Sequence, residues 1–302
     1  MFNLKSILAI VDFRHDQHYA LPRAIELAHK FDLKITVISN IYETFFDFLT
    51  SENHNSEIKA NAIRENRLRL KALIAEQNTN GLEIELHSIW SPNLKDDLSR
   101  FINEQSYDLV LKTTRTHNIL KKLIFTPTDW HLLRDTKTNI LFVKKSSHPE
   151  FSNIIGAINI DDDTEHKELN EKIIIATTSL AQAFHCKSNI LNVFPWTMVQ
   201  YEKFKHLFKE KDFFTTKKER HEQKVKRVVD SILKANSAKL NGKVIIAEGL
   251  EPEDTIPSII KSTKADLLVM GTVGRSGLEA AVIGNTAEKI LDDINCEVLA
   301  IK

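Results

Sequence analysis

Short apolar runs alternate with longer stretches of helical periodicity along the whole chain. Several of these runs are continuous in Val, Ile and Leu rather than alternating, which indicates parallel strands covered on both faces. We expect strands at Ser6–Val11, Lys34–Ile41, Glu83–Trp90, Asp108–Thr114 and Asn139–Lys144, and again at Asn153–Ile160, Ser188–Phe194, Lys243–Gly249, Asp266–Thr272 and Cys296–Lys302.

The stretches between these strands carry apolar residues at helical spacing. Leu21, Ala24, Ile25 and Ala28 follow the i, i+3, i+4, i+7 pattern of an amphipathic helix. Strands that alternate with helices favour right-handed crossovers and a doubly wound parallel sheet. The predicted fold class is therefore α/β, with two Rossmann-like domains of five parallel strands each. The helical spacing recurs at Val225, Val228, Val229 and Ile232.

An internal repeat relates the two halves. When 158 is subtracted from the numbering of the second half, Asp266 falls on Asp108 and Thr272 falls on Thr114. This register runs without gaps from the fourth predicted strand to the fifth. Because the repeated unit is a whole domain, it indicates duplication rather than a solenoid. The polar stretch Ser146–Pro149 contains a helix-breaking proline and predicts the boundary between domains 1–147 and 148–302.

Charge and cysteine content narrow the functional classes. Lys plus Arg equals Asp plus Glu at 41 each in 302 residues, so the formal net charge is zero. A chain with this balance has no overall positive electrostatic field that would attract nucleic acid or anionic lipid, and we expect neither as a partner. Cys186 and Cys296 form no CxxC pair and are too few for a disulfide framework. The first apolar run ends at Asp12 and is too short for a signal peptide, which predicts a cytoplasmic protein.

The segment with the clearest chemistry lies near the C-terminus. Gly271-Thr-Val-Gly274 follows a predicted buried strand, and Gly284-Asn-Thr286 comes after nine further residues, before a helix expected near Ala287. Glycine lets the backbone approach a ligand closely, and the N–H groups at a helix start favour phosphate. Asn285 and Glu288 also predict a capping box at this helix start.

This spacing resembles the ATP-binding loop of the universal stress protein family, G-x-x-G, nine residues, then G-[ST], with Asn285 in place of the Ser or Thr. The resemblance extends over essentially the whole chain, including Ile124–His131 in the first half. It implies ATP or a related adenine nucleotide as the ligand, near the ends of the first, second and fourth strands of the second half. Asn159 stands where the family usually has an acidic residue, with Asp161 two residues on. The binding residues that the resemblance implies are Asn159, Asp161, Val193, Met270, Gly271, Gly274, Arg275, Gly284, Asn285 and Thr286.

The same resemblance implies an assembly and a role. Family members usually dimerise through their fifth strands, so the two halves are expected to form an intramolecular pseudo-dimer, with a homodimer as a further possibility. Pairing would also protect edge strands that are otherwise exposed. The implied role is stress tolerance (DNA damage, starvation, motility or adhesion), by binding rather than turnover. No nucleophile arrangement is visible, so no catalytic residue is predicted; a slow ATPase remains an alternative.

The repeat predicts that only the second half binds nucleotide. In the register of 158, threonines replace the three loop glycines, and each adds a β-branched side chain where backbone must approach phosphate. Pro127 falls on Asn285 and has no N–H to donate. The threonines that align with Gly271, Gly274 and Gly284 in this register are Thr113, Thr116 and Thr126.

Two other constellations have competing interpretations. Aromatic residues follow the second strand of each half, where they either cover the sheet edge and inter-domain seam or line a cleft for an apolar metabolite. Several histidines are expected at the edge of the sheet formed by the carboxyl ends of the strands. A zinc site built from them is geometrically possible, but histidines in loops are more often solvated, so no metal is predicted. The aromatic residues are Tyr42, Phe45, Phe46, Phe48, Phe194, Trp196, Tyr201, Phe204, Phe208, Phe213 and Phe214; the histidines are His15, His18, His117 and His131.

Overall fold

The computed structural model describes residues 2, 4–42, 55–116, 123–145, 150–160, 164–207, 212–272 and 283–302. The chain divides into two compact units. The N-terminal unit comprises Leu4–Thr116 and Phe125–Lys145; the C-terminal unit comprises Ser146–Lys302 together with Met1–Asn3 and His117–Ile124. Each unit therefore contains most of one repeat, and two short segments of the first repeat group with the second.

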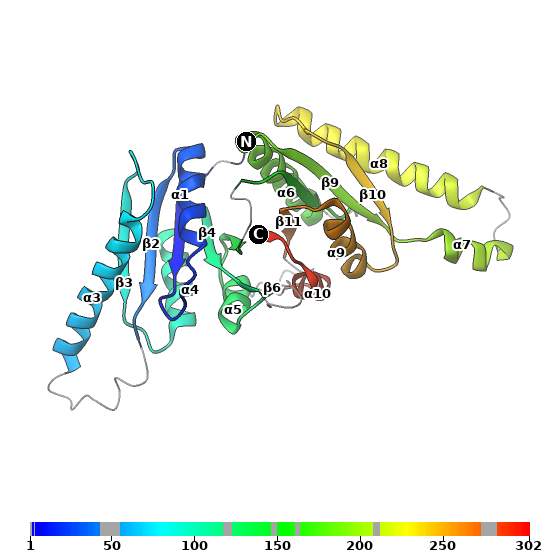
Figure 1. Cartoon of the computed structure of the whole chain (residues 1–302). Coiled ribbons are helices and arrows are strands. Elements are labelled where there is room, and N and C mark those ends of the chain that lie inside the picture. The colour runs from blue at the N-terminus through cyan, green and yellow to red at the C-terminus, as the bar shows by residue number, and fades with distance from the viewer. Residues whose placement is uncertain are drawn as a thin grey trace. The chain divides into compact units, whose positions relative to one another are not determined.

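Five parallel strands of the N-terminal unit follow the order β3-β2-β1-β4-β7, which places the first strand at the centre (Figure 1). Because consecutive strands are joined through helices, this is the doubly wound arrangement that the sequence predicts. The strands are β1 Ser6–Val11, β2 Lys34–Asn40, β3 Ile84–Ile89, β4 Leu109–Thr113 and β7 Asn139–Val143, with the short β5 Arg115–Thr116; the helices are α1 Ala20–Phe31, α3 Asn55–Ala75, α4 Leu94–Gln105 and α5 Pro127–Asp135.

The C-terminal unit repeats the same strand order as β10-β9-β8-β11-β12. Helices α6 and α8 lie on one side of these strands and α9 and α10 on the other (Figure 1). The strands are β8 Asn153–Ala157, β9 Lys187–Phe194, β10 Val244–Glu248, β11 Leu267–Gly271 and β12 Glu297–Ile301, with the short β6 Leu123–Ile124; the helices are α6 Thr164–Ala183, α7 Met198–Phe204, α8 Phe213–Ala235, α9 Pro252–Thr263 and α10 Asn285–Asp293, with the 3-10 turn η1 Lys205–Leu207.

Equivalent contacts in the two units confirm the register of 158. The side chain of Asp108 accepts a hydrogen bond from the N–H of the first residue of β1 at 2.9 Å. Asp266 accepts the matching bond from the first residue of β8 at 2.8 Å. The residues that end α4 and α9, Ser106 and Lys264, are both left-handed, with φ of 54° and 53°. The duplication thus extends to individual side-chain and backbone roles.

The strand predictions hold to within a few residues, and the largest difference has a local cause. The run Asn153–Ile160 was expected to be one strand, but β8 ends at Ala157. Beyond it, the N–H of Asn159 donates to the side-chain oxygen of Asn170 at 3.2 Å instead of continuing the ladder. None of the described helices is long and apolar enough to cross a membrane.

Five of the aromatic residues predicted in the second half pack against one another, whereas Phe204 is 43% exposed. Phe194, Tyr201 and Phe214 are buried, and Trp196 and Phe213 pack against them. The ring centroids of Phe194 and Phe214 are 5.9 Å apart at 72°, the edge-to-face geometry that aromatic pairs favour. This is the packing expected of a sheet-edge cover. Phe45, Phe46, Phe48 and Phe208 lie outside the described residues.

Candidate functional site

Three strand ends meet at one edge of the C-terminal unit. Ala157, the last residue of β8, is in register with Leu191 of β9 on one side and with Met270 of β11 on the other. Ligands of open α/β sheets bind at this carboxyl edge. The structure therefore brings Asn159, Val193 and Gly271, predicted from separate stretches of sequence, to the ends of neighbouring strands.

Helix α10 begins at this edge with an unusual first turn. Its N-cap is Gly284, in extended conformation with φ −66° and ψ 141°, and no N-cap side chain bonds to the helix. The helix starts at Asn285, two residues earlier than expected, and the predicted capping box is wrong because Gly284 rather than Asn285 holds the N-cap position. The carbonyl of Gly284 accepts from Glu288 N–H at 3.0 Å. The exposed residues Asn285 and Thr286 open the helix, where N–H groups lack intrahelical acceptors.

Gly271 and Met270 have packing roles that the sequence did not indicate. A Cβ on Gly271 would lie 2.4 Å from the Cδ2 atom of Leu169, so glycine admits that leucine against the end of β11. Neither Gly271 nor Gly284 needs a left-handed conformation, since Gly81 is the one described glycine with positive φ. Met270 is buried in the core. Glycine at 271 is therefore explained by close packing of α6.

The remaining predicted residues fall into two groups. Val193 is half-buried and pairs with Ala247 of β10, and Asn159 is exposed after β8. Asp161, Gly274 and Arg275 lie outside the described residues. The described part of the candidate site thus consists of the ends of β8, β9 and β11 and the first turn of α10.

Two buried asparagines that the sequence analysis missed shape this edge. The side chain of Asn170 donates to the carbonyl of Asn159 at 2.6 Å and accepts from its N–H, which fixes the chain as it leaves β8. Asn192 donates to the carbonyl of Ile158 at 3.0 Å, and its side-chain oxygen lies 2.5 Å from His221 Nε2. A polar residue inside an apolar run was the available signal, but no motif marks it.

The surroundings of His221 favour the neutral form of its imidazole. Partial burial, helped by the nearby charge of Lys224, lowers the pKa of His221 below its ordinary value. Its Nε2–H is then the donor to the carboxamide oxygen of Asn192. This contact links α8 to the end of β9 without adding charge to the site.

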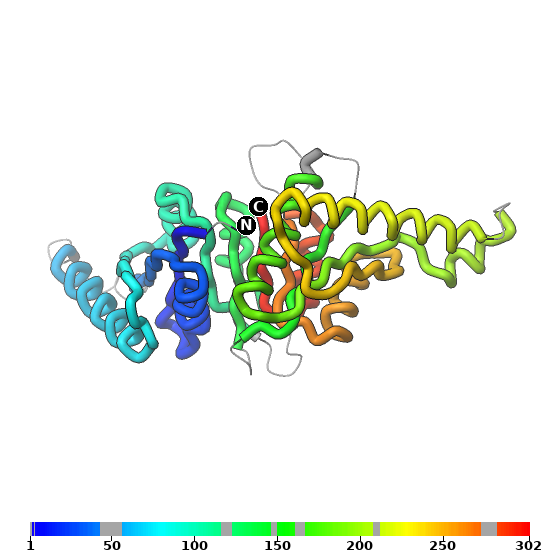
Figure 2. The backbone as a smooth tube through the Cα atoms, turned by 90° about the horizontal axis from the view of Figure 1, so that it is seen from above, coloured from blue at the N-terminus to red at the C-terminus, as the bar shows by residue number. Residues whose placement is uncertain are grey.

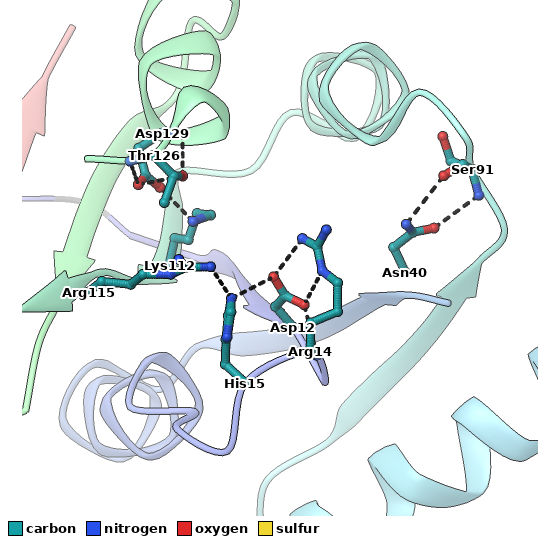
Figure 3. Close-up of polar contacts among 9 residues, drawn as sticks. All are labelled: Asp12, Arg14, His15, Asn40, Ser91, Lys112, Arg115, Thr126 and Asp129. Carbon is teal, nitrogen blue, oxygen red and sulfur yellow. Dashed lines mark hydrogen bonds and ion pairs between the residues drawn. The ribbon is translucent and has the colours of Figure 1, made fainter. Parts of the chain in front are cut away.

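The corresponding edge of the N-terminal unit is filled by its own ion pair (Figure 3). Helix α5 starts with a full capping box, in which Thr126 Oγ1 accepts from Asp129 N–H and the Asp129 carboxylate accepts from Thr126 N–H at 2.6 Å. The side chain of Asp129 is fully buried, and its Oδ1 atom lies 2.5 Å from Lys112 Nζ. The helix start that would receive a phosphate is therefore occupied by the protein's own carboxylate, whose charge Lys112 balances.

Other polar groups at this edge are also paired internally. The Thr113 hydroxyl, which replaces Gly271, accepts from the N–H of Ala20 at 2.9 Å and so satisfies the start of α1. Asp12 binds Arg14 through both carboxylate oxygens, at 2.8 and 2.7 Å (Figure 3). Burial alone would raise the pKa of Asp12, but the hydrogen bonds and charge of Arg14 outweigh it and the pKa is lowered.

Two of the predicted histidines, His15 and His131, pair with side chains of the N-terminal unit. His15 accepts a hydrogen bond from Arg115, and His131 lies 3.1 Å from Asp96 and 3.1 Å from Asp135. His117 falls outside the described residues. Within the described part of the chain, no group of three or more His, Cys, Asp or Glu is arranged to hold a metal ion.

Comparison with known proteins assigns the family. The model of the universal stress protein family matches residues 3–144 and 158–302, so the chain belongs to this family and carries two of its domains. It is 28% identical to a universal stress protein E homolog of Haemophilus influenzae, covering 99% of this chain and 97% of that protein. It is 29% identical to universal stress protein E of Salmonella typhi, covering 99% and 94%. The chain thus resembles tandem universal stress proteins over its full length.

Solved structures show the same fold. A putative universal stress protein from Pseudomonas aeruginosa UCBPP-PA14 superposes with a TM-score of 0.70 at 22% identity, covering 100% of this chain and 94% of that one. A universal stress protein from Archaeoglobus fulgidus gives a TM-score of 0.59 at 14% identity, covering 98% of each. Membership of the family supports a stress-related role.

Proposed function

We propose that this chain binds ATP or a related adenine nucleotide in its C-terminal half and acts in stress tolerance by binding rather than turnover. The observation that carries the proposal is the contrast between two equivalent helix starts. Helix α10 has a glycine N-cap with no side-chain cap. Helix α5 has a complete capping box and a buried carboxylate. Unpaired N–H groups at a helix start favour phosphate. Of these two equivalent helix starts, α10 is the one without a side-chain cap.

We place the nucleoside at the neighbouring strand ends. In this proposal the phosphates bind the N–H groups of Asn285 and Thr286, while the base and ribose lie toward Asn159 and Val193. Asn170 and Asn192 keep the backbone beside Asn159 fixed. A site whose backbone is already held in place loses less conformational entropy when ligand binds.

The biological role and the domain limits are part of the same proposal. The resemblance to stress proteins supports functions in tolerance of DNA damage and starvation, and in motility or adhesion. We place the domain boundary between residues 147 and 148, inside the interval between the two family matches, which end at 144 and resume at 158. A cytoplasmic location accords with this role.

Gly284→Val tests the proposal. A β-branched side chain at the N-cap restricts the approach of phosphate to the helix start, so we expect ATP affinity to fall at least about tenfold. The conformation of Gly284 is open to valine, with φ −66°, so the fold should persist. Isothermal titration calorimetry of the full-length protein measures the change.

The matched control is Thr126→Val, at the equivalent position of the N-terminal half. It removes the N-cap hydroxyl and is expected to cost about 1 kcal/mol of stability. ATP affinity should stay unchanged. Equal losses in both variants, or no loss with Gly284→Val, would contradict the assignment to the C-terminal half.

A further inference from the structure

The C-terminal unit carries an apolar, positively charged projection. Helix α7, the turn η1 and the first turns of α8 extend beyond the strands of their own unit (Figures 1 and 2). Tyr201 anchors α7 by packing on Phe214, with ring centroids 5.6 Å apart. We call Met198–Leu207 the tip.

The tip exposes a cluster of large apolar side chains, which is rare on the surface of a monomeric soluble protein. Val199 is 80% exposed and Leu207 67% exposed, with Met198 and Phe204 close to half exposed. Four of the seven exposed large hydrophobic residues identified in the described chain fall within this ten-residue segment. Val199 lies on the side of α7 away from Tyr201, so the helix does not bury it against its own unit. Such a cluster marks an interaction surface.

The tip and the N-terminal part of α8 that follows it carry an excess of positive charge. Residues 198–227 contain ten Lys or Arg and five Asp or Glu, a formal charge of +5 in a chain whose total is zero. Three of these lysines pair with carboxylates: Lys205 with Glu202, Lys218 with Glu248 and Lys226 with Glu222. No carboxylate of the described residues pairs with Lys203 or Arg220. Lys203 Nζ instead lies 5.5 Å from the ring centroid of Phe204.

We propose that the tip docks on an anionic lipid surface. Exposed aliphatic and aromatic residues interspersed with lysine are the composition of interfacial helices, where apolar side chains enter the headgroup region and lysine side chains reach the phosphates. A projecting segment can reach a flat surface that a concave site cannot. The zero net charge of the whole chain predicts no membrane partner. That total does not reflect the local excess of positive charge in residues 198–227. The proposal is independent of nucleotide binding.

Vesicle co-sedimentation of the full-length protein tests this. Phosphatidylcholine vesicles containing phosphatidylglycerol should retain the protein, pure phosphatidylcholine vesicles should retain much less, and about 0.5 M salt should release it because the Debye length shrinks to a few ångströms. Val199→Asp combined with Leu207→Asp should lower the partition coefficient at least about tenfold, since two apolar contacts are lost and two charges repel the surface.

The control carries the same chemical change elsewhere. Leu68 and Leu250 are 53% and 52% exposed and lie outside the tip, so Leu68→Asp with Leu250→Asp should leave vesicle binding close to wild type after correction for net charge. Failure of the wild-type protein to bind anionic vesicles, or equal losses in the two double variants, would overturn the proposal. Salt-sensitive binding to soluble polyglutamate without binding to vesicles would assign the tip to an acidic protein and would also overturn it.

Discussion

Replacement of Asp129 by alanine is expected to destabilise the protein by about 3–5 kcal/mol, because it strands the charge of Lys112 in a largely buried position. The Asp129 side chain is fully buried, and that of Lys112 is 13% exposed. The same carboxylate also closes the capping box of α5 with Thr126. Urea unfolding followed by circular dichroism measures the loss.

A second variant separates the charge effect from the loss of packing. The register of 158 places Met270 on Lys112 and Ala287 on Asp129, so the C-terminal half already tolerates the neutral combination. Lys112→Met with Asp129→Ala should therefore recover most of the stability lost in Asp129→Ala. If the double variant is as unstable as the sum of the two single variants, the ion pair does not account for the cost.

Asn285→Pro is expected to weaken ATP binding by about tenfold to a hundredfold. Proline at the first helical position removes the N–H proposed to bind phosphate, and a charge-assisted hydrogen bond is worth about 1.5–3 kcal/mol. The helix should survive, since proline suits this position. Gly284 before it is extended, the conformation that a following proline requires. Pro127 already holds the equivalent place at the start of α5.

Asn285→Ala is the matched control, because it removes the side chain and keeps the N–H. Calorimetric titration with ATP should give nearly wild-type affinity for Asn285→Ala and the large loss for Asn285→Pro. Similar affinities in the two variants would show that the backbone donor at 285 plays no part. A loss in both would point to the Asn285 side chain instead.

The fold could be predicted from the sequence because several residues indicate each of its elements. Continuous apolar runs identified the strands, and the repeat placed Asp108 and Asp266 at equivalent positions, where both bind the start of a first strand. Strand ends were less predictable. The end of β8 depends on Asn170, whose side chain competes for the backbone of Asn159 across a fold that has to exist first. The pseudo-dimer of the two halves stays a prediction.

The sequence predicted the start of α10 to within two residues, and the ligand site at that position stays a prediction. The glycine spacing marked the start of α10. It gave no sign that Gly271, whose part in ligand binding stays a prediction, also makes room for Leu169. The threonine substitutions predict that the first half does not bind nucleotide, and this stays a prediction. They gave no sign that Lys112 and Asp129 fill its helix start, because a contact between residues 17 apart in sequence depends on tertiary packing.

The stoichiometry of ATP binding to the full-length chain tests the central claim most directly. Native mass spectrometry in the presence of ATP, with calorimetry for affinity, counts the nucleotides bound. We expect one ATP per chain for wild type and Asn285→Ala, and a loss of that ATP in Asn285→Pro at the same concentration. Two ATP per chain, or one that persists undiminished in Asn285→Pro, would contradict binding at the start of α10 alone.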